Sequence, residues 1–107
     1  MYETLCQPLN VEKQIRLYTG TGNPLLAQRI ANVLHLELSG LKIEKFANGV
    51  IYARFEETVR GSEVFFVQSI AGANVNDLLM ETLIVADAAH RASASNFTAV
   101  IPHYGYA

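Results

Sequence analysis

The side chains that could bind a ligand in this 107-residue sequence gather in two short segments. Phe46 ends a strand-like run and begins a turn, so its ring could stack on a nucleotide base or pack in the core. Thr58 and Arg60 precede a Gly turn, and a hydroxyl beside a guanidinium could bind phosphate, although a solvated surface arginine fits equally well. The two segments therefore suggest a base contact and a phosphate contact.

Other polar groups give weaker signals. The loop 19–23 lies between a strand and a helix, where backbone N–H groups can hold an anion. It lacks the Gly-Lys-Ser/Thr of a P-loop, and a tight turn explains it better. His35, His90 and His103 show no metal-ligand spacing, although His103 follows a strand's carboxyl end, where open α/β sheets place ligands. The single cysteine, Cys6, excludes an internal disulfide, and we assign no catalytic or metal-binding residue.

Hydrophobic periodicity and turn residues predict the elements that position these groups. Strands are expected at 15–19, 41–46, 51–55, 64–68 and 98–101, with helices at 24–35 and from 74–76 to 95. The order strand, helix, strand, hairpin, strand, helix, strand predicts an α/β fold with a mainly parallel sheet flanked by helices. Residues 1–14 carry no period and contain Pro8, so we expect a disordered arm.

Individual segments carry more specific expectations. In the first helix, Asn23 should be the N-cap, and Leu26, Ile30, Val33 and Leu34 recur at helical spacing as its apolar face. The turn 47–50 gives the strongest hairpin signal in the sequence. The run 64–68 is apolar without alternation, as in a strand covered on both faces, and the last strand should also be buried.

Composition limits the function classes. Half of the residues are hydrophobic, 17% are charged and the net charge is −2. These values exclude a disordered chain and argue against a protein that coats nucleic acid or an anionic membrane. No apolar run approaches the ~20 residues of a membrane helix, and residues 1–14 do not resemble a signal peptide. We therefore expect a cytoplasmic protein without nucleic-acid or membrane partners.

The second half of the chain is poor in charge. Between positions 64 and 107 only Asp77, Glu81, Asp87 and Arg91 are charged. They should form one narrow polar stripe on the second helix, whose remaining sides are apolar. Because exposing several large apolar side chains is costly, this half should pack against other subunits or another part of a larger protein.

Several short segments together resemble one known family. From Ile15 to Ala107 the sequence is similar to the N-terminal domain of ribose-phosphate pyrophosphokinases, also called PRPP synthetases. The similarity rests on segments that keep the family's order and spacing, namely 23–24, 26–31, 45–49, 57–61, 67–69, 76–81, 91–94, 98–102 and 104–107.

The resemblance implies a phosphoribosyltransferase-like fold with a projecting β-hairpin. Such enzymes transfer the pyrophosphoryl group of MgATP to ribose 5-phosphate, giving AMP and PRPP, and assemble as homo-oligomers in which dimers build hexamers. Phe46 matches the aromatic residue that stacks on the adenine of ATP bound to a neighbouring subunit. Asn48 matches an Asp or Asn that forms a hydrogen bond with the same base. Val50 stands where a Glu is usual. Thr58 and Arg60 match the regulatory phosphate and ADP site.

The sequence ends before three parts of the family's pattern, namely an ATP-binding Arg/Gln/Asp segment, a metal-binding histidine and the catalytic loop. We therefore expect residues 15–107 to be a partial domain, inactive alone, with Mg²⁺ bound mainly by parts outside it. Two alternatives stay open. One is a non-catalytic truncated paralogue that binds and regulates a PRPP synthetase, and the other is an unrelated flavodoxin-like nucleotide binder.

Overall fold

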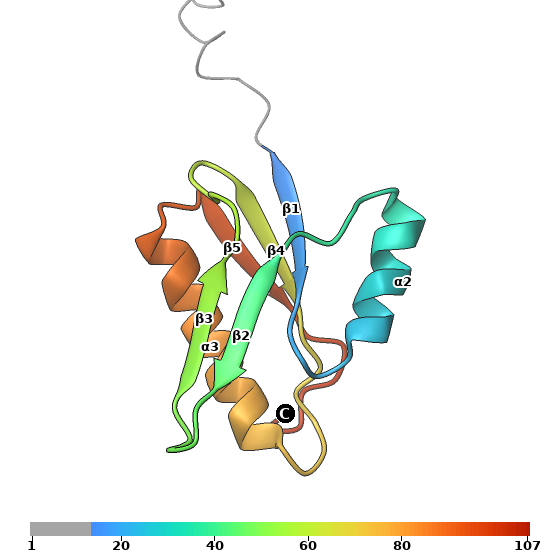
Figure 1. Cartoon of the computed structure of the whole chain (residues 1–107). Coiled ribbons are helices and arrows are strands. Elements are labelled where there is room, and N and C mark those ends of the chain that lie inside the picture. The colour runs from blue at the N-terminus through green and yellow to red at the C-terminus, as the bar shows by residue number, and fades with distance from the viewer. Residues whose placement is uncertain (1–13) are drawn as a thin grey trace, which may run out of the picture.

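The strands and helices of the computed structural model follow the predicted order. The structure describes residues 14–107, so the expected arm at 1–14 lies outside the described residues except for Gln14. The elements are β1 Ile15–Thr19, α2 Pro24–Leu34, β2 Leu41–Lys45, β3 Ile51–Phe55, β4 Glu63–Val67, α3 Val75–Arg91 and β5 Asn96–Val100 (Figure 1).

A parallel three-stranded sheet in the order β1-β4-β5 forms the centre of the fold. Its register pairs Ile15 with Glu63 and Glu63 with Asn96. The central strand β4 is largely buried, which confirms the expectation of a strand covered on both faces. The expectation of a buried last strand is wrong, because β5 pairs only with β4 and alternate residues remain exposed at the sheet edge.

Two small hydrophobic cores lie on opposite faces of this sheet. Leu17 and Val67 pack with residues of α2, whereas Tyr18 and Phe66 pack with Val85 of α3. Neighbouring residues of a strand point to opposite faces, so β1 and β4 each contribute to both cores. Burial raises the pKa of the Tyr18 phenol, and the nearby positive charge of Arg16 partly opposes this rise.

Helix α2 begins as predicted but packs through a different face. The Asn23 side chain accepts a hydrogen bond from the Leu26 N–H at 3.2 Å, as expected of an N-cap. Ala27 and Ala31 are fully buried, whereas Val33 is 76% exposed. The expected apolar face is therefore wrong at its C-terminal end, because two alanines one turn apart bring the helix close to the sheet.

Helix α3 is shorter than expected at its C-terminal end. It ends at Arg91, and Ser93 adopts a left-handed φ of 64°, so the chain leaves the helix before the predicted end at Ser95. The Ser95 N–H then donates to the Ser62 carbonyl at 2.8 Å, which aligns β5 beside β4. Within residues 14–107, neither helix is long and apolar enough to cross a membrane.

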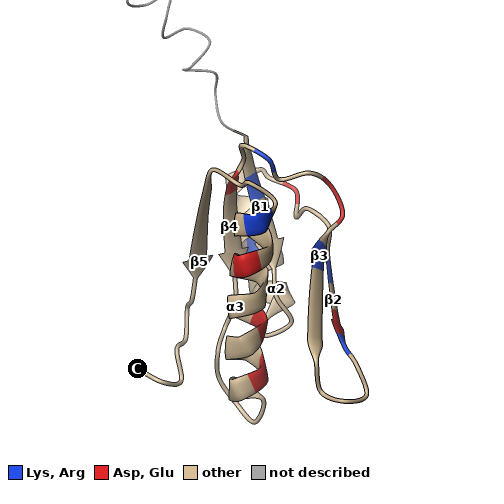
Figure 2. Ribbon diagram, turned by 90° about the vertical axis from the view of Figure 1, so that its left-hand side faces the viewer, with Lys and Arg blue, Asp and Glu red and all other residues tan. Residues whose placement is uncertain are grey.

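Strands β2 and β3 form a separate antiparallel hairpin, with Leu41 opposite Phe55 and Lys45 opposite Ile51. Figure 2 shows this hairpin as a layer of its own beside α3 and the sheet. Its inner residues, including Ile43 and Phe55, pack against the core that contains Tyr18. The strands of the ribbon are attached to the body along one face, so the expectation of a projecting hairpin is wrong for them. Its turn, residues 46–50, is exposed to solvent.

Candidate functional site

The hairpin turn is held in shape by three local hydrogen bonds. The Phe46 N–H donates to the Val50 carbonyl at 2.8 Å, and the Gly49 N–H donates to the Phe46 carbonyl at 2.9 Å. The Asn48 Oδ1 accepts from the Val50 N–H at 3.1 Å. Gly49 has a φ of 90°, which favours glycine. The turn therefore presents its side chains on a fixed backbone.

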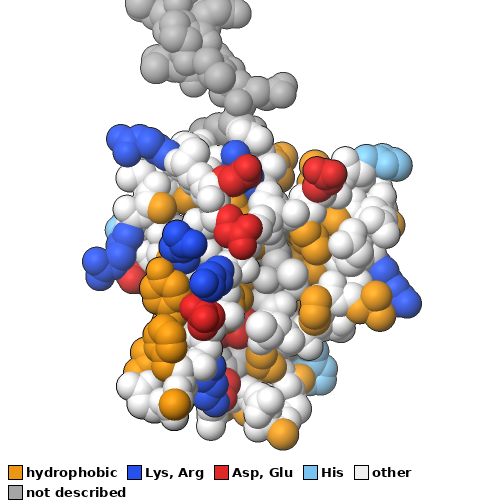
Figure 3. Space-filling view, in the orientation of Figure 1, with side chains coloured by type: hydrophobic (Ala, Val, Ile, Leu, Met, Phe, Trp, Pro, Cys, Tyr) orange, Lys and Arg blue, Asp and Glu red, His pale blue; other side chains and the backbone are white. Residues whose placement is uncertain are grey.

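Exposed apolar side chains gather on this end of the hairpin. Phe46 is 49% exposed and Val50 is 53% exposed, while the Tyr52 ring lies 6.2 Å from the Phe46 ring, centroid to centroid. Figure 3 shows hydrophobic side chains over this lower left corner of the molecule. Half of the Phe46 surface stays in solvent, so the ring lies outside the protein's own core and can stack on a flat ligand.

Thr58 and Arg60 lie in the loop that follows β3. The Thr58 Oγ1 accepts from the Arg60 N–H at 3.2 Å, and both residues are exposed. Gly61 has a φ of 71°, and its N–H donates to the Ser93 carbonyl at 2.9 Å, which anchors the loop next to the end of α3. The hydroxyl and the guanidinium are thus presented from one fixed turn.

The structure does not bring the two predicted segments together. The turn with Phe46 precedes β3, and the loop with Thr58 follows it, so the length of the ribbon separates them (Figure 1). Five residues of strand span roughly 17 Å. A cavity of about 520 Å³ adjoins Thr58 and is also lined by Arg54 and Arg91. The hairpin therefore carries two distinct candidate surfaces, one at each end.

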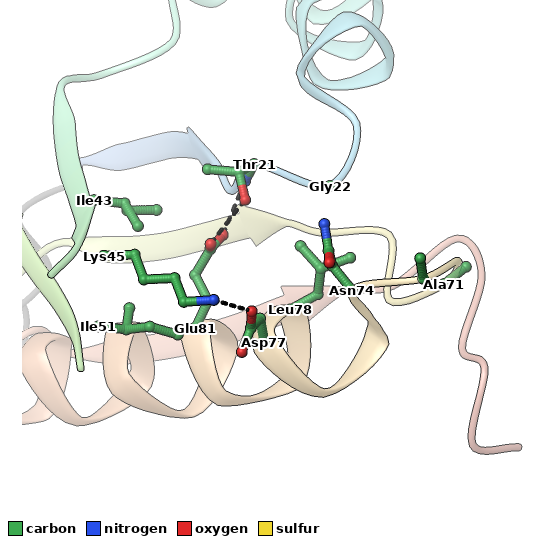
Figure 4. Close-up of a pocket in the computed structure, with 11 residues that line it drawn as sticks. Thr21, Gly22, Ile43, Lys45, Ile51, Ala71, Asn74, Asp77, Leu78 and Glu81 are labelled. Atoms are coloured by element: carbon green, nitrogen blue, oxygen red, sulfur yellow. Dashed lines mark hydrogen bonds and ion pairs between the residues drawn. The ribbon is translucent and has the colours of Figure 1, made fainter. Parts of the chain in front are cut away.

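A second cavity lies between the loop after β1, the hairpin and the first turns of α3. Its volume is about 410 Å³. Figure 4 shows Glu81 pointing from α3 toward Thr21, and Lys45 of the hairpin pointing toward Asp77. The Lys45 Nζ lies 2.6 Å from the Asp77 Oδ2, which fastens the end of β2 next to Phe46 onto the start of α3.

Glu81 is the centre of a buried polar network on one side of this cavity. Its carboxylate accepts from the Thr21 N–H at 2.8 Å, the Thr21 hydroxyl at 2.8 Å and the Gln68 Nε2 at 2.6 Å. Gln68 is fully buried, and its Oε1 accepts from the Gly22 N–H at 2.9 Å. A Cβ on Gly20 would overlap the end of the Gln68 side chain, so a larger residue there would displace Gln68 from this network.

These contacts correct one expectation from the sequence and decide between two interpretations of the loop 19–23. Glu81 is 5% exposed and is not part of a solvated stripe on α3. The N–H groups of Thr21 and Gly22, which could have held an external anion, bind the side chains of Glu81 and Gln68 instead. The tight-turn interpretation of the loop 19–23 therefore agrees with the structure, and the anion-binding interpretation does not.

The histidines lie apart in the fold. His35 has a left-handed φ of 56° at the end of α2, His90 is exposed on α3, and His103 is exposed after β5. The His103 carbonyl accepts from the Ile70 N–H at 2.8 Å. Within residues 14–107, no group of three or more His, Cys, Asp or Glu side chains is placed to hold a metal ion.

Comparison with known proteins identifies the family. A family model described as the N-terminal domain of ribose phosphate pyrophosphokinase matches residues 15–107. The chain belongs to the ribose-phosphate pyrophosphokinase family. This result confirms the resemblance found in the sequence, and it assigns the parallel sheet and the hairpin to the N-terminal domain of the family.

Individual members of the family support the assignment. Ribose-phosphate pyrophosphokinase 1 of Spinacia oleracea is 50% identical over 96 residues, which are 90% of this chain and 28% of the spinach protein. The crystal structure of phosphoribosylpyrophosphate synthetase from Mycobacterium smegmatis superposes with a TM-score of 0.83 at 41% identity. The match covers 88% of this chain and 31% of that chain. The chain thus spans about a third or less of these pyrophosphokinases.

A more distant structure shows the wider fold class. Hypoxanthine phosphoribosyl transferase of Trypanosoma cruzi superposes with a TM-score of 0.59 at 8% identity, covering 94% of this chain and 57% of that one. At that identity the likeness concerns the fold alone. The expected phosphoribosyltransferase-like α/β class is therefore confirmed.

Sequence reasoning missed the network of Glu81, Gln68 and Thr21. Gln68 closes an apolar strand, and a polar residue at that position, directly after a buried run, was an available signal for a buried hydrogen-bonding role. The spacing along α3 could not reveal the role of Glu81, because the helical period places it on the same side as the exposed charges.

Proposed function

We propose that this chain is the partial N-terminal domain, residues 15–107, of a ribose-phosphate pyrophosphokinase. The enzyme transfers the pyrophosphoryl group of MgATP to the 1-hydroxyl of ribose 5-phosphate and releases AMP and PRPP. The observation that carries the proposal is the family match over residues 15–107. The cytoplasmic location expected from composition belongs to the same proposal.

Phe46 and Asn48 hold the adenine of ATP bound to a neighbouring subunit in this proposal. The half-exposed Phe46 ring supplies the stacking face, and its backbone is fixed by the turn. The Lys45–Asp77 ion pair keeps the end of β2 in place against α3. The chain thus contributes a preorganised aromatic surface, which lowers the entropy cost of binding the base.

Homo-oligomerisation is supported by apolar side chains that this chain leaves uncovered. Met80 and Leu83 on the outer side of α3 are about half exposed, and Val100 is partly exposed at the sheet edge. Full burial of one large apolar side chain contributes roughly 1.5–3 kcal/mol, so covering a half-exposed side chain contributes about half of that value. Contacts between copies at these positions fit the proposed assembly of dimers into a hexamer.

Residues 15–107 bind and position substrate in this proposal, and they do not catalyse the reaction alone. Phosphoryl transfer needs cations arranged around the transferred group. The chain covers 28% of the spinach relative. Since the described residues offer no metal-binding cluster, we derive no step through a metal held by this chain, and Mg²⁺ enters as part of the MgATP substrate.

The test is a chimeric enzyme in which residues 15–107 replace the matching N-terminal part of the M. smegmatis synthetase. We expect it to form PRPP and AMP from ATP and ribose 5-phosphate at a rate within about tenfold of the parent enzyme, a loss of no more than about 1.4 kcal/mol. The rate is followed as AMP released. A chimera that assembles like the parent, as judged by light scattering, but releases no AMP would contradict the proposal.

Val50 favours a second candidate, a non-catalytic paralogue that regulates a complete synthetase. It places an exposed apolar side chain in the turn proposed to recognise the base. The 107-residue chain should then bind a full-length synthetase, such as the spinach relative, and change its rate. If the two do not co-elute in gel filtration and the rate is unchanged, this candidate is wrong.

Arg60 is proposed to bind phosphate and ADP as regulators, together with Thr58. In the chimeric enzyme, Arg60→Ala should raise the phosphate concentration for half-maximal activation by about tenfold or more, because a charge-assisted hydrogen bond is lost. ADP inhibition should weaken in parallel. Arg29→Ala, an exposed arginine on α2, is the matched control and should change neither. Unchanged phosphate and ADP responses in Arg60→Ala would exclude this role.

A further inference from the structure

The loop that follows β3 presents two exposed side chains from an anchored backbone. Val59 is fully buried in the core, and the Gly61 N–H donates to the Ser93 carbonyl at 2.9 Å. Thr58 and Arg60 stand on either side of Val59 in the chain, and both are exposed. The backbone of this loop is therefore held independently of the charged side chains around it.

Arg16 of β1 places a positive charge next to the start of this loop. Its Nη1 donates to the Glu57 Oε1 at 3.1 Å, and its Nη2 donates to the Gln14 Oε1 at 3.4 Å. Figure 1 shows β1 beginning at the end of the fold where β3 leads into the loop. Within residues 14–107, Glu57 is the acidic side chain that pairs with Arg16. The pair joins the first strand to the residue directly before Thr58.

Most of the Arg16 side chain is shielded from water. It is 14% exposed, and its Nε is buried without a hydrogen-bond partner among the described residues. Water screens such a charge less than a fully exposed one, so the charge acts more strongly on its neighbours. Glu57 is 70% exposed, and its carboxylate is held next to this charge. The electrostatic effect of Glu57 on its surroundings therefore depends on Arg16.

The charge of Glu57 matters because Glu57 directly precedes Thr58 at the proposed phosphate site. A carboxylate repels a phosphate ion, so an uncompensated Glu57 would oppose the attraction that Arg60 exerts. The Arg16 charge at 3.1 Å offsets that of Glu57. The ion pair therefore favours the binding of an anion by Thr58 and Arg60.

We propose that Arg16 is a positioning residue of the regulatory phosphate and ADP site, which acts by holding and neutralising Glu57 beside the loop. The inference rests on the proposed function, because it adds a residue to the regulation assigned to Thr58 and Arg60. Arg16 does not need to contact the anion in this role. Its effect reaches the site through the charge of Glu57.

The experiment measures the phosphate concentration for half-maximal activation in variants of the chimeric enzyme. Arg16→Gln should raise this concentration by about three- to tenfold, because it leaves the Glu57 carboxylate uncompensated. The double variant Arg16→Gln/Glu57→Gln should return it to within about twofold of the unsubstituted chimera, because both charges are then absent while Val59 and Gly61 still hold the loop. The KM for ATP should stay unchanged in both variants, since Phe46 lies at the other end of the hairpin.

Glu57→Gln alone tests the same charge with Arg16 in place. The glutamine amide can still accept the hydrogen bond from Arg16, so the variant should fold normally. The Arg16 charge is then unopposed, and the phosphate concentration for half-maximal activation should fall by about two- to fivefold. This variant also decides the matter if Arg16→Gln does not assemble. Arg29→Gln, an exposed arginine of α2, is the matched control and should change nothing.

Three results overturn this inference while the proposed function stands, provided that Arg60→Ala still weakens the phosphate response. They are an unchanged response in Arg16→Gln, a double variant as impaired as Arg16→Gln, and a Glu57→Gln variant that needs as much phosphate as the unsubstituted chimera or more. If Arg60→Ala leaves the phosphate response intact, the proposed regulatory role is wrong and this inference fails with it.

Discussion

Replacing Glu81 with leucine should lower the free energy of unfolding of the 107-residue chain by about 2–4 kcal/mol. Leucine keeps most of the side-chain volume, so the loss comes from hydrogen bonding and not from a cavity. Three donors on Thr21 and Gln68 lose their acceptor, and Gln68 is fully buried, so water cannot easily replace it. The change is large beside the ~5–15 kcal/mol that stabilise a typical domain.

Equilibrium urea unfolding followed by circular dichroism measures this difference. Asp87→Leu is the matched control, because Asp87 lies on the same helix and bonds the exposed Arg91 at 2.7 Å. Exposed ion pairs contribute about 0–1 kcal/mol, so the control should lose little stability. Equal losses for Glu81→Leu and Asp87→Leu would show that the buried network does not stabilise the loop after β1.

In the chimeric enzyme, Phe46→Ala should raise the KM for ATP by about tenfold or more, since stacking of one base on an aromatic side chain contributes roughly 1–3 kcal/mol. The effect should fall on KM and leave kcat nearly unchanged, because the base is held equally in the ground state and the transition state. Phe46 is 49% exposed, so the variant should fold normally.

Two further substitutions separate stacking from simple hydrophobic contact. Phe46→Trp keeps a π face and should keep the KM close to that of the unsubstituted chimera. Phe46→Leu keeps an apolar side chain without a π face and should resemble Phe46→Ala. The stacking role is wrong if the alanine variant binds ATP as tightly as the unsubstituted enzyme in steady-state kinetics.

The position of Lys45 connects the two predictions. Its ion pair with Asp77 at 2.6 Å joins the hairpin to α3, one turn before Glu81 on the same helix. Both residues of the pair are about half exposed, so the pair itself should contribute little to the stability of the chain. Its physical effect is to restrict where the end of β2, and with it Phe46, can lie relative to the body.

The sequence by itself determined the local structure of this protein. Asn23 capped the first helix, the turn 47–50 closed a hairpin, and the apolar run around β4 became the central strand. Each of these features depends on neighbouring residues in the chain, through a side-chain bond to the nearby backbone, a glycine conformation or a continuous apolar pattern. The family resemblance rested on the same short segments.

Only the tertiary structure decided which faces are covered and which predicted residues lie together. The helical period places Glu81 and Asp87 on α3 but cannot show that the loop after β1 donates hydrogen bonds to Glu81 and not to Asp87. Likewise, spacing could not show that β5 lies at the edge of the sheet or that Val33 remains in solvent. Burial depends on the element packed above a residue, and that element comes from distant parts of the chain.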